Sequence, residues 1–531
     1  MTVLTSKLDT SSESYKRAQS VMADKLAELD TENDRLRAMG GEKAVARHRK
    51  RDKLTVRERI ELLLDPDTPF LELAPYAAWG TDFNLGGGIV GGIGVVSGVE
   101  TLVIGSDPTD HGGTINPWTL RKQLRLMDIA QENRLPLISL VESGGANLPA
   151  QKDIFIPGGA QFRKLAELSK EGIPTIALVF GNSTAGGAYI PGMSDYTVMI
   201  DKKSKVFLAG PPLVKAATGE ISDDESLGGA QMHAKVSGLA DYFATDEQDA
   251  IRIGRRIVAR LNWKKEGQGP AYAAPPRLDE EELTGIVPED LKIPFDPKEI
   301  IGRVVDDSDF DEFKPLYGQS LVTGWARIHG YPVGILANAR GVLFSEEAKK
   351  ATQFIQIANR QRTPLLFIHN TTGYMVGRTY EERGIIKDGA AMIHAVSTSA
   401  VPHLTLLVGA SYGAGHYGMC GRAFNPRFVY AWPSAKSAVM GSQQLADVVT
   451  SVAAASAKSR GIPFDEDANE MRREMIKNQI DSESLPLFLS GHIYDDGIID
   501  PRDTRTVLGI SLSAISQEEI DSDRRYGIFR M

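Results

Sequence analysis

Cysteine is nearly absent from the sequence: Cys420 is the only one among 531 residues. A single thiol allows no internal disulfide and no cysteine-built zinc site, and the nine histidines show no paired metal-ligand spacing. Long apolar runs are also missing, because stretches such as Ile173 to Phe180 fall far short of the ~20 residues that a membrane helix needs. The first residues show no basic-then-apolar leader pattern. We therefore expect a cytoplasmic protein with no bound metal and no membrane partner.

Positive charge is in deficit, with 60 basic against 69 acidic residues and a net charge of -9. That sign argues against a protein whose main partner is nucleic acid. No Gly-Lys dipeptide occurs, which excludes a Walker-type phosphate loop, and the literal dinucleotide fingerprint at residues 86–91 is followed by β-type residues instead of a helix. The basic run from Arg47 to Lys53, with Arg57 and Arg59, is expected to form a solvated helix face that can also serve nucleotide phosphates.

Glycine, by contrast, is abundant, and its 52 residues are clustered around an internal repeat. Residues 130–145 resemble residues 358–373, and residues 172–189 resemble residues 400–417. Pro136 pairs with Pro364 and Pro174 with Pro402, and the offset along the chain is the same for both pairs. Two matches at one offset with no gap between them indicate a duplication.

The repeated segments read as alternating strands and helices. Residues 91–107 and 321–337 have β-type patterns, residues 120–132 and 346–360 have helical patterns, and buried apolar strands follow. This predicts an α/β fold with a largely parallel sheet, used twice. We expect an N-terminal helical extension over 1–45 with an amphipathic helix at 15–36, domains over 46–263 and 291–531, and a linker over 264–290. The proline, glycine and acidic residues of that linker should prevent it from forming a packed core.

The glycine clusters follow two neighbouring strands in each half. After the strand at 173–181 come Ala185, Gly186, Gly187 and Ala188, and then helix formers, so uncovered backbone N–H groups should lie at a helix N-terminus. The loop at 143–146 should supply a second donor, because carboxyl ends of parallel strands meet at one crevice. The second half offers the loops 372–374 and 412–415. We predict two oxyanion holes, against the alternative that the glycines only permit close packing.

A serine-nucleophile site is a weaker alternative. Residues 409–413 read Gly-Ala-Ser-Tyr-Gly, which fits the nucleophile-elbow pattern around Ser411. Only His416 and His492 follow it as possible bases, and His416 lies too near in sequence to be the usual partner. Acyl-enzyme chemistry is therefore not favoured.

Longer motifs resemble one family. AGGAYIPGMSDYTVMI, FLAGPPLVKAATGE, SLGGAQMHAKVSGLAD, NTTGYMVG, SYGAGHYGMCGRAFNPRFVYAWP and DDGIIDPRDTR are similar, in order, to carboxyltransferase (beta) subunits of biotin-dependent acyl-CoA carboxylases, especially the methylcrotonoyl-CoA carboxylase branch. The resemblance runs from about residue 46 to 508. It implies two tandem crotonase-like domains, the first binding acyl-CoA and the second carboxybiotin, with each active site shared between two copies of the chain.

The resemblance also implies residue roles. Gly186 and Gly187 would donate to the thioester oxygen, and Ala414 and Gly415 to the ureido oxygen of biotin, where negative charge develops. Further substrate contacts would come from Gly144, Gly145, Ala146, Ala188, Arg47 and Arg51, and further biotin contacts from Thr372, Gly373, Tyr374 and His416. No protein base is needed, since the released ureido nitrogen can take the substrate proton.

The same resemblance implies partners. Members of the family bind no ATP and carry no biotin themselves, and this sequence has no Ala-Met-Lys-Met biotinylation site. A separate biotin carboxylase and carrier (alpha) subunit is implied, together with a homo-oligomer, most simply the hexamer of the family.

Two departures leave the substrate open. The segment 440–446 reads MGSQQLA where methylcrotonoyl-type members tend to read MGGEQAA, and His416 stands where Asn is common. Methylcrotonoyl-CoA and saturated short chains such as acetyl-CoA or propionyl-CoA are both retained as substrates. A biotin-dependent decarboxylase subunit and a non-catalytic scaffold homologue are the alternative functions.

Overall fold

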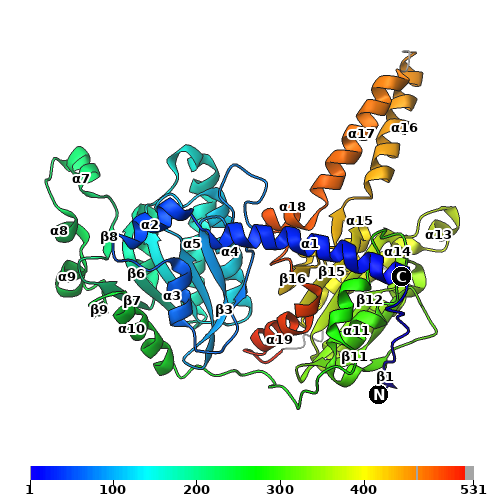
Figure 1. Cartoon of the computed structure of the whole chain (residues 1–531), viewed down its shortest axis with the longest axis horizontal. Coiled ribbons are helices and arrows are strands. Elements are labelled where there is room, and N and C mark those ends of the chain that lie inside the picture. The colour runs from blue at the N-terminus through cyan, green and yellow to red at the C-terminus, as the bar shows by residue number, and fades with distance from the viewer. Residues whose placement is uncertain (1, 462–464, 521–531) are drawn as a thin grey trace.

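The computed structural model describes residues 2–461 and 465–520 and contains two β-sheets, each flanked by helices (Figure 1). The first sheet runs in spatial order through β2 (Leu71–Glu72), β3 (Ile89–Val96), β4 (Val99–Ser106), β5 (Leu137–Ser143), β6 (Thr175–Thr184), β7 (Tyr196–Ile200) and β9 (Tyr242–Ala244), with β8 (Lys205–Phe207) paired to β6. Its helices include α2 (Glu42–Arg49), α3 (Val56–Leu63), α4 (Pro117–Glu132), α5 (Gln151–Lys170), α7 (Pro211–Thr218) and α10 (Glu247–Arg260). Strands β4 to β9 run parallel.

The second sheet repeats this plan. Its order is β1 (Thr2–Val3), β10 (Asp309–Glu312), β11 (Leu321–Ile328), β12 (Tyr331–Asn338), β14 (Leu365–Tyr374), β15 (His403–Tyr412) and β16 (Phe428–Ala431). Strands β13 (Gly341–Leu343) and β17 (Lys436–Ala438) pair with β14 and β15. Its helices include α11 (Lys298–Val304), α12 (Ser345–Gln361), α13 (Arg378–Glu382), α14 (Ile385–Thr398), α16 (Ser442–Arg460), α17 (Glu466–Glu483), α18 (Pro486–Gly491) and α19 (Thr504–Ile515).

The two sheets agree in register, which confirms the duplication. Leu137 pairs with Thr175 in the first sheet and Leu365 with His403 in the second, and these two pairs are related by the same offset as the repeated prolines. A buried lysine is repeated as well: Lys122 donates to the carbonyl of Ile89 at 2.9 Å, and Lys350 to that of Leu321 at 2.8 Å. Burial lowers the pKa of each ammonium to about 8. Both halves have therefore kept a buried lysine that donates to a backbone carbonyl.

Helix α1 (Glu13–Arg37) crosses from one half of the molecule to the other (Figure 1). A Cβ at Gly285 would lie 2.3 Å from the ring of Tyr15 near its start, and Tyr76 donates to Asn33 at 2.9 Å near its end. The prediction that residues 264–290 form an unpacked linker is wrong for the part around Gly285, which packs against Tyr15 of α1. The acidic run of this segment begins the 3-10 helix η4 (Glu280–Gly285), and Leu283 is buried in a hydrophobic core to which both halves contribute. Glu280 and Glu281 are exposed, Glu282 pairs with the buried Arg303, and α1 covers the apolar side of η4.

A buried ion cluster also joins the two halves. Asp496 accepts from Arg125 of α4 at 2.8 Å and from Arg422 at 3.0 Å. These cations hold the pKa of Asp496 far below its usual range, against the opposing effect of burial. Its neighbour Asp495 is bonded to Ser490, and burial raises the pKa of Asp495 to about 7.

Asp495 should make stability depend on pH. Because its pKa is raised in the folded protein, the stability that its protonated form provides is lost as the pH rises from about 4 to about 7. Asp495→Asn keeps the shape of the side chain without the charge, so we expect a higher melting temperature than wild type at pH 8 and little difference at pH 4.5. Scanning calorimetry at both pH values checks this. A wild-type advantage at pH 8 would show that Asp495 is stabilised as an anion.

Candidate active site

The first glycine loop begins where β6 ends. Ala185 takes a left-handed conformation with φ 55°, and the 3-10 helix η2 (Ala185–Ala188) and α6 (Tyr189–Met193) follow. The N-cap residue Thr184 makes no side-chain capping bond, so no side chain covers the first-turn amides. A Cβ at Gly187 would lie 3.5 Å from Ser143, and one at Gly145 would lie 3.5 Å from the carbonyl oxygen of Thr184. The loops at 143–146 and 185–188 therefore lie together.

The second crevice has the same plan but is tighter. Gly413 has φ 55°, as Ala185 has in the first crevice, and begins α15 (Gly413–Gly418). The N-cap residue Tyr412 again makes no side-chain capping bond. A Cβ at Gly415 would lie 2.8 Å from the Cα of Gly373, closer than real Cβ contacts allow. Both pairs of loops predicted from the sequence are brought together by the fold.

This difference in space gives a prediction. Gly415→Ala forces the start of α15 away from Gly373, whereas Gly187→Ala places its methyl group at an ordinary contact distance. Small misplacements of positioning groups can lower a catalytic rate by about 10²-fold. We therefore expect the steady-state rate to fall by about that factor in Gly415→Ala and only slightly in Gly187→Ala. Steady-state rates of the two purified variants, with circular dichroism as a check of folding, measure the difference. Equal rates would mean that the loop at 372–374 can retreat.

Comparisons with known proteins fit this geometry. Residues 47–527 match the carboxyl transferase domain family. The chain belongs to the carboxyl transferase family. A probable biotin-dependent acyl-coenzyme A carboxylase beta2 subunit of Mycobacterium tuberculosis is 67% identical, with 100% of both chains covered. The mitochondrial methylcrotonoyl-CoA carboxylase beta chain of Dictyostelium discoideum is 46% identical, covering 100% of this chain and 91% of its own.

A solved structure confirms the predicted fold class of two tandem crotonase-like domains. The crystal structure of the geranyl-CoA carboxylase beta subunit of P. aeruginosa matches this carboxyltransferase with a TM-score of 0.91 at 42% identity, covering 100% of this chain and 99% of that one. The resemblance seen in the sequence motifs is thereby confirmed.

The basic run of the carboxyltransferase divides into two groups, and the expectation of a solvated face is wrong for one of them. Arg59 is fully buried, pairs with Glu247 at 3.0 Å and contacts Glu142 at 2.9 Å, where Lys53 also binds. These carboxylate partners lie far away along the chain, so the run itself gave no sign of burial. The cluster packs against β5, which carries Glu142, and against β6, where Arg59 lies over the ring of Phe180.

Arg47 and Arg51 form the other group. Both are exposed, and neither guanidinium has a hydrogen-bond or ion-pair partner among residues 2–461 and 465–520. The adjacent turn is fixed by Lys203, which donates to the carbonyl of Asp52 at 2.5 Å. Lys203 precedes β8, which pairs with the last residues of β6. The two free cations therefore lie on the side of the sheet where the first glycine loop begins.

The residues predicted to contact biotin differ in exposure. Thr372 is exposed, and its hydroxyl donates to the carbonyl of Gly341 at 2.9 Å. Tyr374 packs behind α15, where a Cβ at Gly418 would lie 2.2 Å from its hydroxyl oxygen, and burial raises the pKa of Tyr374. His416 turns toward Ser411, and its Nδ1 lies 2.7 Å from the Oγ of that residue.

Sequence reasoning missed His369. This side chain is fully buried within β14, and its Nδ1 lies 2.8 Å from the Oγ of Ser411. Burial lowers the pKa of His369 to about 3 and that of His416 to about 4, so both imidazoles are neutral at physiological pH. Ser411 is itself fully buried, so no substrate carbonyl can reach its Oγ. The nucleophile-elbow alternative is therefore not supported.

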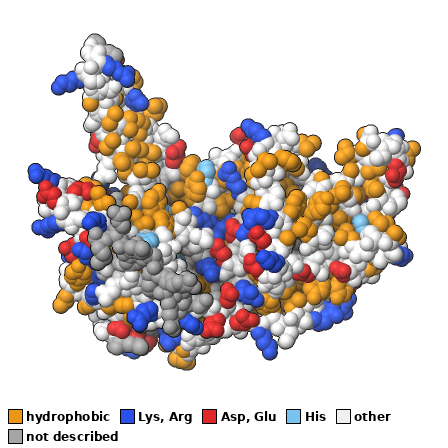
Figure 2. All heavy atoms as spheres, turned by 180° about the vertical axis from the view of Figure 1, so that it is seen from behind, with side chains coloured by type: hydrophobic (Ala, Val, Ile, Leu, Met, Phe, Trp, Pro, Cys, Tyr) orange, Lys and Arg blue, Asp and Glu red, His pale blue; other side chains and the backbone are white. Residues whose placement is uncertain are grey.

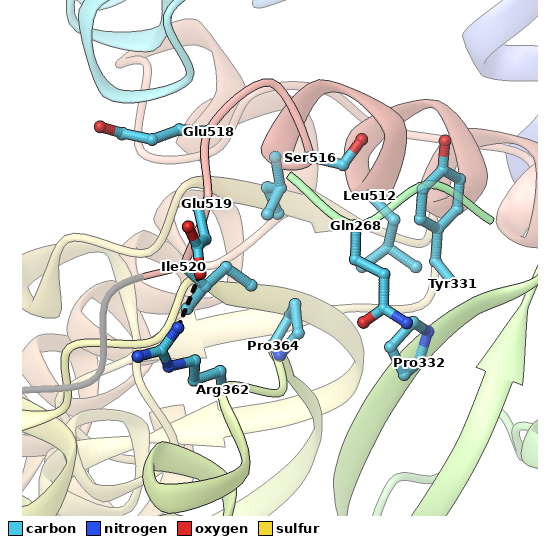
Figure 3. Close-up of a pocket in the computed structure, with 11 residues that line it drawn as sticks. Gln268, Tyr331, Pro332, Arg362, Pro364, Leu512, Ser516, Glu518, Glu519 and Ile520 are labelled. Carbon is cyan, nitrogen blue, oxygen red and sulfur yellow. Dashed lines mark hydrogen bonds and ion pairs between the residues drawn. The ribbon is translucent and has the colours of Figure 1, made fainter. Parts of the chain in front are cut away.

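A separate pocket lies in the second half, at the beginnings of the strands and away from the glycine loops. The cavity has a volume of about 140 Å³, and the ion pair between Arg362 and Glu519, 2.7 Å long, lies at one side of it. Figure 3 shows Tyr331 and Pro364 in its wall. Tyr331 and Pro364 stand at the beginnings of β12 and β14, whereas the glycine loops follow the ends of β14 and β15. The cavity is therefore not part of either glycine-loop crevice.

Proposed function

We propose that this carboxyltransferase is the beta subunit of a biotin-dependent acyl-CoA carboxylase. It would move a carboxyl group from carboxybiotin, carried by a separate alpha subunit, to an acyl-CoA of the methylcrotonoyl, acetyl or propionyl class. The observation that carries the proposal is the pair of matched, uncapped helix starts, each closed by a neighbouring strand loop. Two oxygens gain charge in this transfer, and each crevice offers backbone donors for one of them.

The roles of the residues follow from this arrangement. Gly186 and Gly187 would stabilise the thioester oxygen of the substrate, and Ala414 and Gly415 the ureido oxygen of biotin. The substrate would also be bound by Gly144, Gly145, Ala146, Ala188, Arg47 and Arg51, and biotin by Thr372, Gly373 and Tyr374, with His416 behind them. The transfer breaks the N–C bond of carboxybiotin and forms a C–C bond on the acyl group, while the proton leaving carbon goes to the ureido nitrogen.

The free cations Arg47 and Arg51 would bind the phosphates of coenzyme A. They are exposed and unpaired on the side of the first sheet where the Gly186 loop begins. An anionic ligand on a chain of net charge -9 needs such local positive charge. This supports the assignment of acyl-CoA to the first crevice.

We further propose that copies of the chain assemble, most simply as a hexamer, with the first crevice of one copy facing the second crevice of another. The hairpin of α16 and α17 projects from the body, and apolar side chains gather on it (Figure 2). Val452 and Met471 on this hairpin and Leu213 on α7 are all more than 60% exposed. Such unpaired apolar surface is typical of an interface.

No helix among residues 2–461 and 465–520 is long and apolar enough to cross a membrane. A cytoplasmic location remains our proposal, based on the single cysteine.

The proposal is tested with the native complex. Purification on streptavidin should recover this chain together with a larger biotinylated subunit. The complex is then supplied with ATP, labelled bicarbonate and, in turn, methylcrotonoyl-CoA, acetyl-CoA and propionyl-CoA, and kcat/KM is compared. Carboxylation of at least one is expected. No carboxylation of these or of longer acyl-CoAs would overturn the proposal, and a tenfold advantage of saturated substrates would remove the chain from the methylcrotonoyl branch.

A further inference from the structure

Three side chains form a continuous hydrogen-bonded chain behind the second crevice. The Nε2 of His369 lies 2.6 Å from the carbonyl oxygen of Met419, and its Nδ1 lies 2.8 Å from the Oγ of Ser411. The same Oγ lies 2.7 Å from the Nδ1 of His416. The chain joins β14 and β15 to α15, and it reaches both that helix and its C-cap residue, Met419.

The direction of each bond follows by elimination. A carbonyl oxygen only accepts, so the Nε2 of His369 donates to Met419, and the Nδ1 of this neutral imidazole must accept. Ser411 therefore gives its hydroxyl proton to His369. The remaining bond can only run from the Nδ1–H of His416 to the Oγ of Ser411. Each of the three hydrogen bonds thus has one direction, which fixes the tautomers of both histidines.

The position of these hydrogen-bonded residues at the start of α15 explains what they do. An ordinary N-cap side chain holds a helix start by accepting from the N–H of position N2 or N3. With Tyr412 as N-cap, those positions are Ala414 and Gly415, the two amides that the proposed function assigns to biotin. A side-chain cap would compete with the ligand for the same protons. Ser411 at N′ and His416 at N4 instead occupy the two positions that a hydrophobic staple joins, and they leave N2 and N3 free.

The first crevice provides an internal comparison. At the offset that relates Pro136 to Pro364, Val141 stands in place of His369 and Ala188 in place of His416. Ser183, in place of Ser411, donates directly to the carbonyl of Gly187 at 2.8 Å. The histidine pair therefore belongs to the second crevice alone and is not required by the fold.

We propose that His369, Ser411 and His416 form a polar staple that positions the amides of Ala414 and Gly415 for the biotin half of the reaction. These residues are positioning residues, because their polar atoms bond to one another and to the backbone. The inference rests on the proposed function, which assigns those two amides to the ureido oxygen.

The test uses the complete complex with its biotin-bearing subunit. Ser411→Ala removes only a hydroxyl and breaks two bonds of the staple, and His416→Ala breaks one. We expect each to lower kcat for acyl-CoA carboxylation, and the rate of carboxybiotin decarboxylation without acyl-CoA, by about tenfold, because a loosened donor costs less than a deleted one. The KM for acyl-CoA should stay unchanged. His416→Asn retains an N–H at the distance of Nδ1 and should restore most of the rate.

A matched control separates positioning from general damage. His403 is another buried histidine on β15, bonded to Ser399 at 2.8 Å and to the Sγ of Cys420 at 3.2 Å, and it lies outside the staple. His403→Gln should lower the melting temperature while leaving the decarboxylation rate near wild type. The staple is refuted if Ser411→Ala keeps the wild-type decarboxylation rate, if His403→Gln slows it equally, or if His416→Asn is as slow as His416→Ala. Gly415→Pro, measured alongside, tests the proposed function separately from the staple. A wild-type decarboxylation rate in that variant would overturn the proposed function itself.

Discussion

Gly187→Pro is expected to slow carboxylation of acyl-CoA by about 10²- to 10³-fold, the usual cost of removing one oxyanion-hole donor. Proline has no backbone N–H, and the first turn of a helix tolerates it because the amides there have no intrahelical partner. Gly187 is buried beside Ser143 at the place where the two loops of the first crevice meet. The loss should appear in kcat, since the thioester oxygen carries full charge only as the transition state is approached.

Two comparisons make this result specific. Gly187→Ala adds a methyl group at a normal contact distance of 3.5 Å from Ser143 and keeps the N–H, so most of the activity should remain. In the proposed assignment, decarboxylation of carboxybiotin without acyl-CoA involves only the second crevice, so it should be spared in Gly187→Pro. If the alanine variant is as slow as the proline variant, the space at Gly187 matters and its amide does not. If decarboxylation falls equally, the two crevices do not act separately.

The sequence predicted the architecture because duplication leaves a signal that needs no partner residues. A constant offset linked Pro136 to Pro364 and Pro174 to Pro402 before any strand was placed, and the structure repeats it in strand register. The glycine loops were predictable for a related reason. A loop between a buried strand and a helix exposes backbone amides wherever side chains are absent, and this depends on local sequence only.

The polar staple and the buried cations were not predictable in the same way. Ser411 and His416 lie too close in sequence for the usual nucleophile and base, yet a spacing of five is the one that joins N′ to N4 across a helix start. The spacing is visible in the sequence, but only the structure shows that it spans a helix start. Arg59 gave no signal, because its partner Glu247 lies 188 residues away and only the fold brings the charges together. Long-range ion pairs of this kind leave no periodic pattern.

Asp496→Ala is expected to have the largest effect on stability, about 3–5 kcal/mol, because removing the central carboxylate of a buried ion cluster leaves Arg422 without its carboxylate and Arg125 with only that of Glu132, at 3.9 Å. Asp496 is fully buried, and its carboxylate accepts from Arg125, Arg422 and the backbone N–H of Val429 at 2.8 to 3.2 Å. Arg125 belongs to the first half of the chain, and Arg422 and Val429 belong to the second. The substitution therefore weakens the contact between the halves as well as the local core.

An exposed pair provides the control for this prediction. Arg17 and Glu289 also join distant segments, at 2.6 Å, but both side chains are about half exposed or more. Solvent screens such a pair, so Glu289→Gln should leave the melting temperature almost unchanged. Scanning calorimetry of the two variants beside wild type measures the contrast. Asp496→Ala should melt well below wild type. A melting temperature equal to that of Glu289→Gln would mean that Arg125 and Arg422 reach water when the carboxylate is removed, and that the hydrophobic core built from residues of both halves, and not the ion cluster, holds the two halves together.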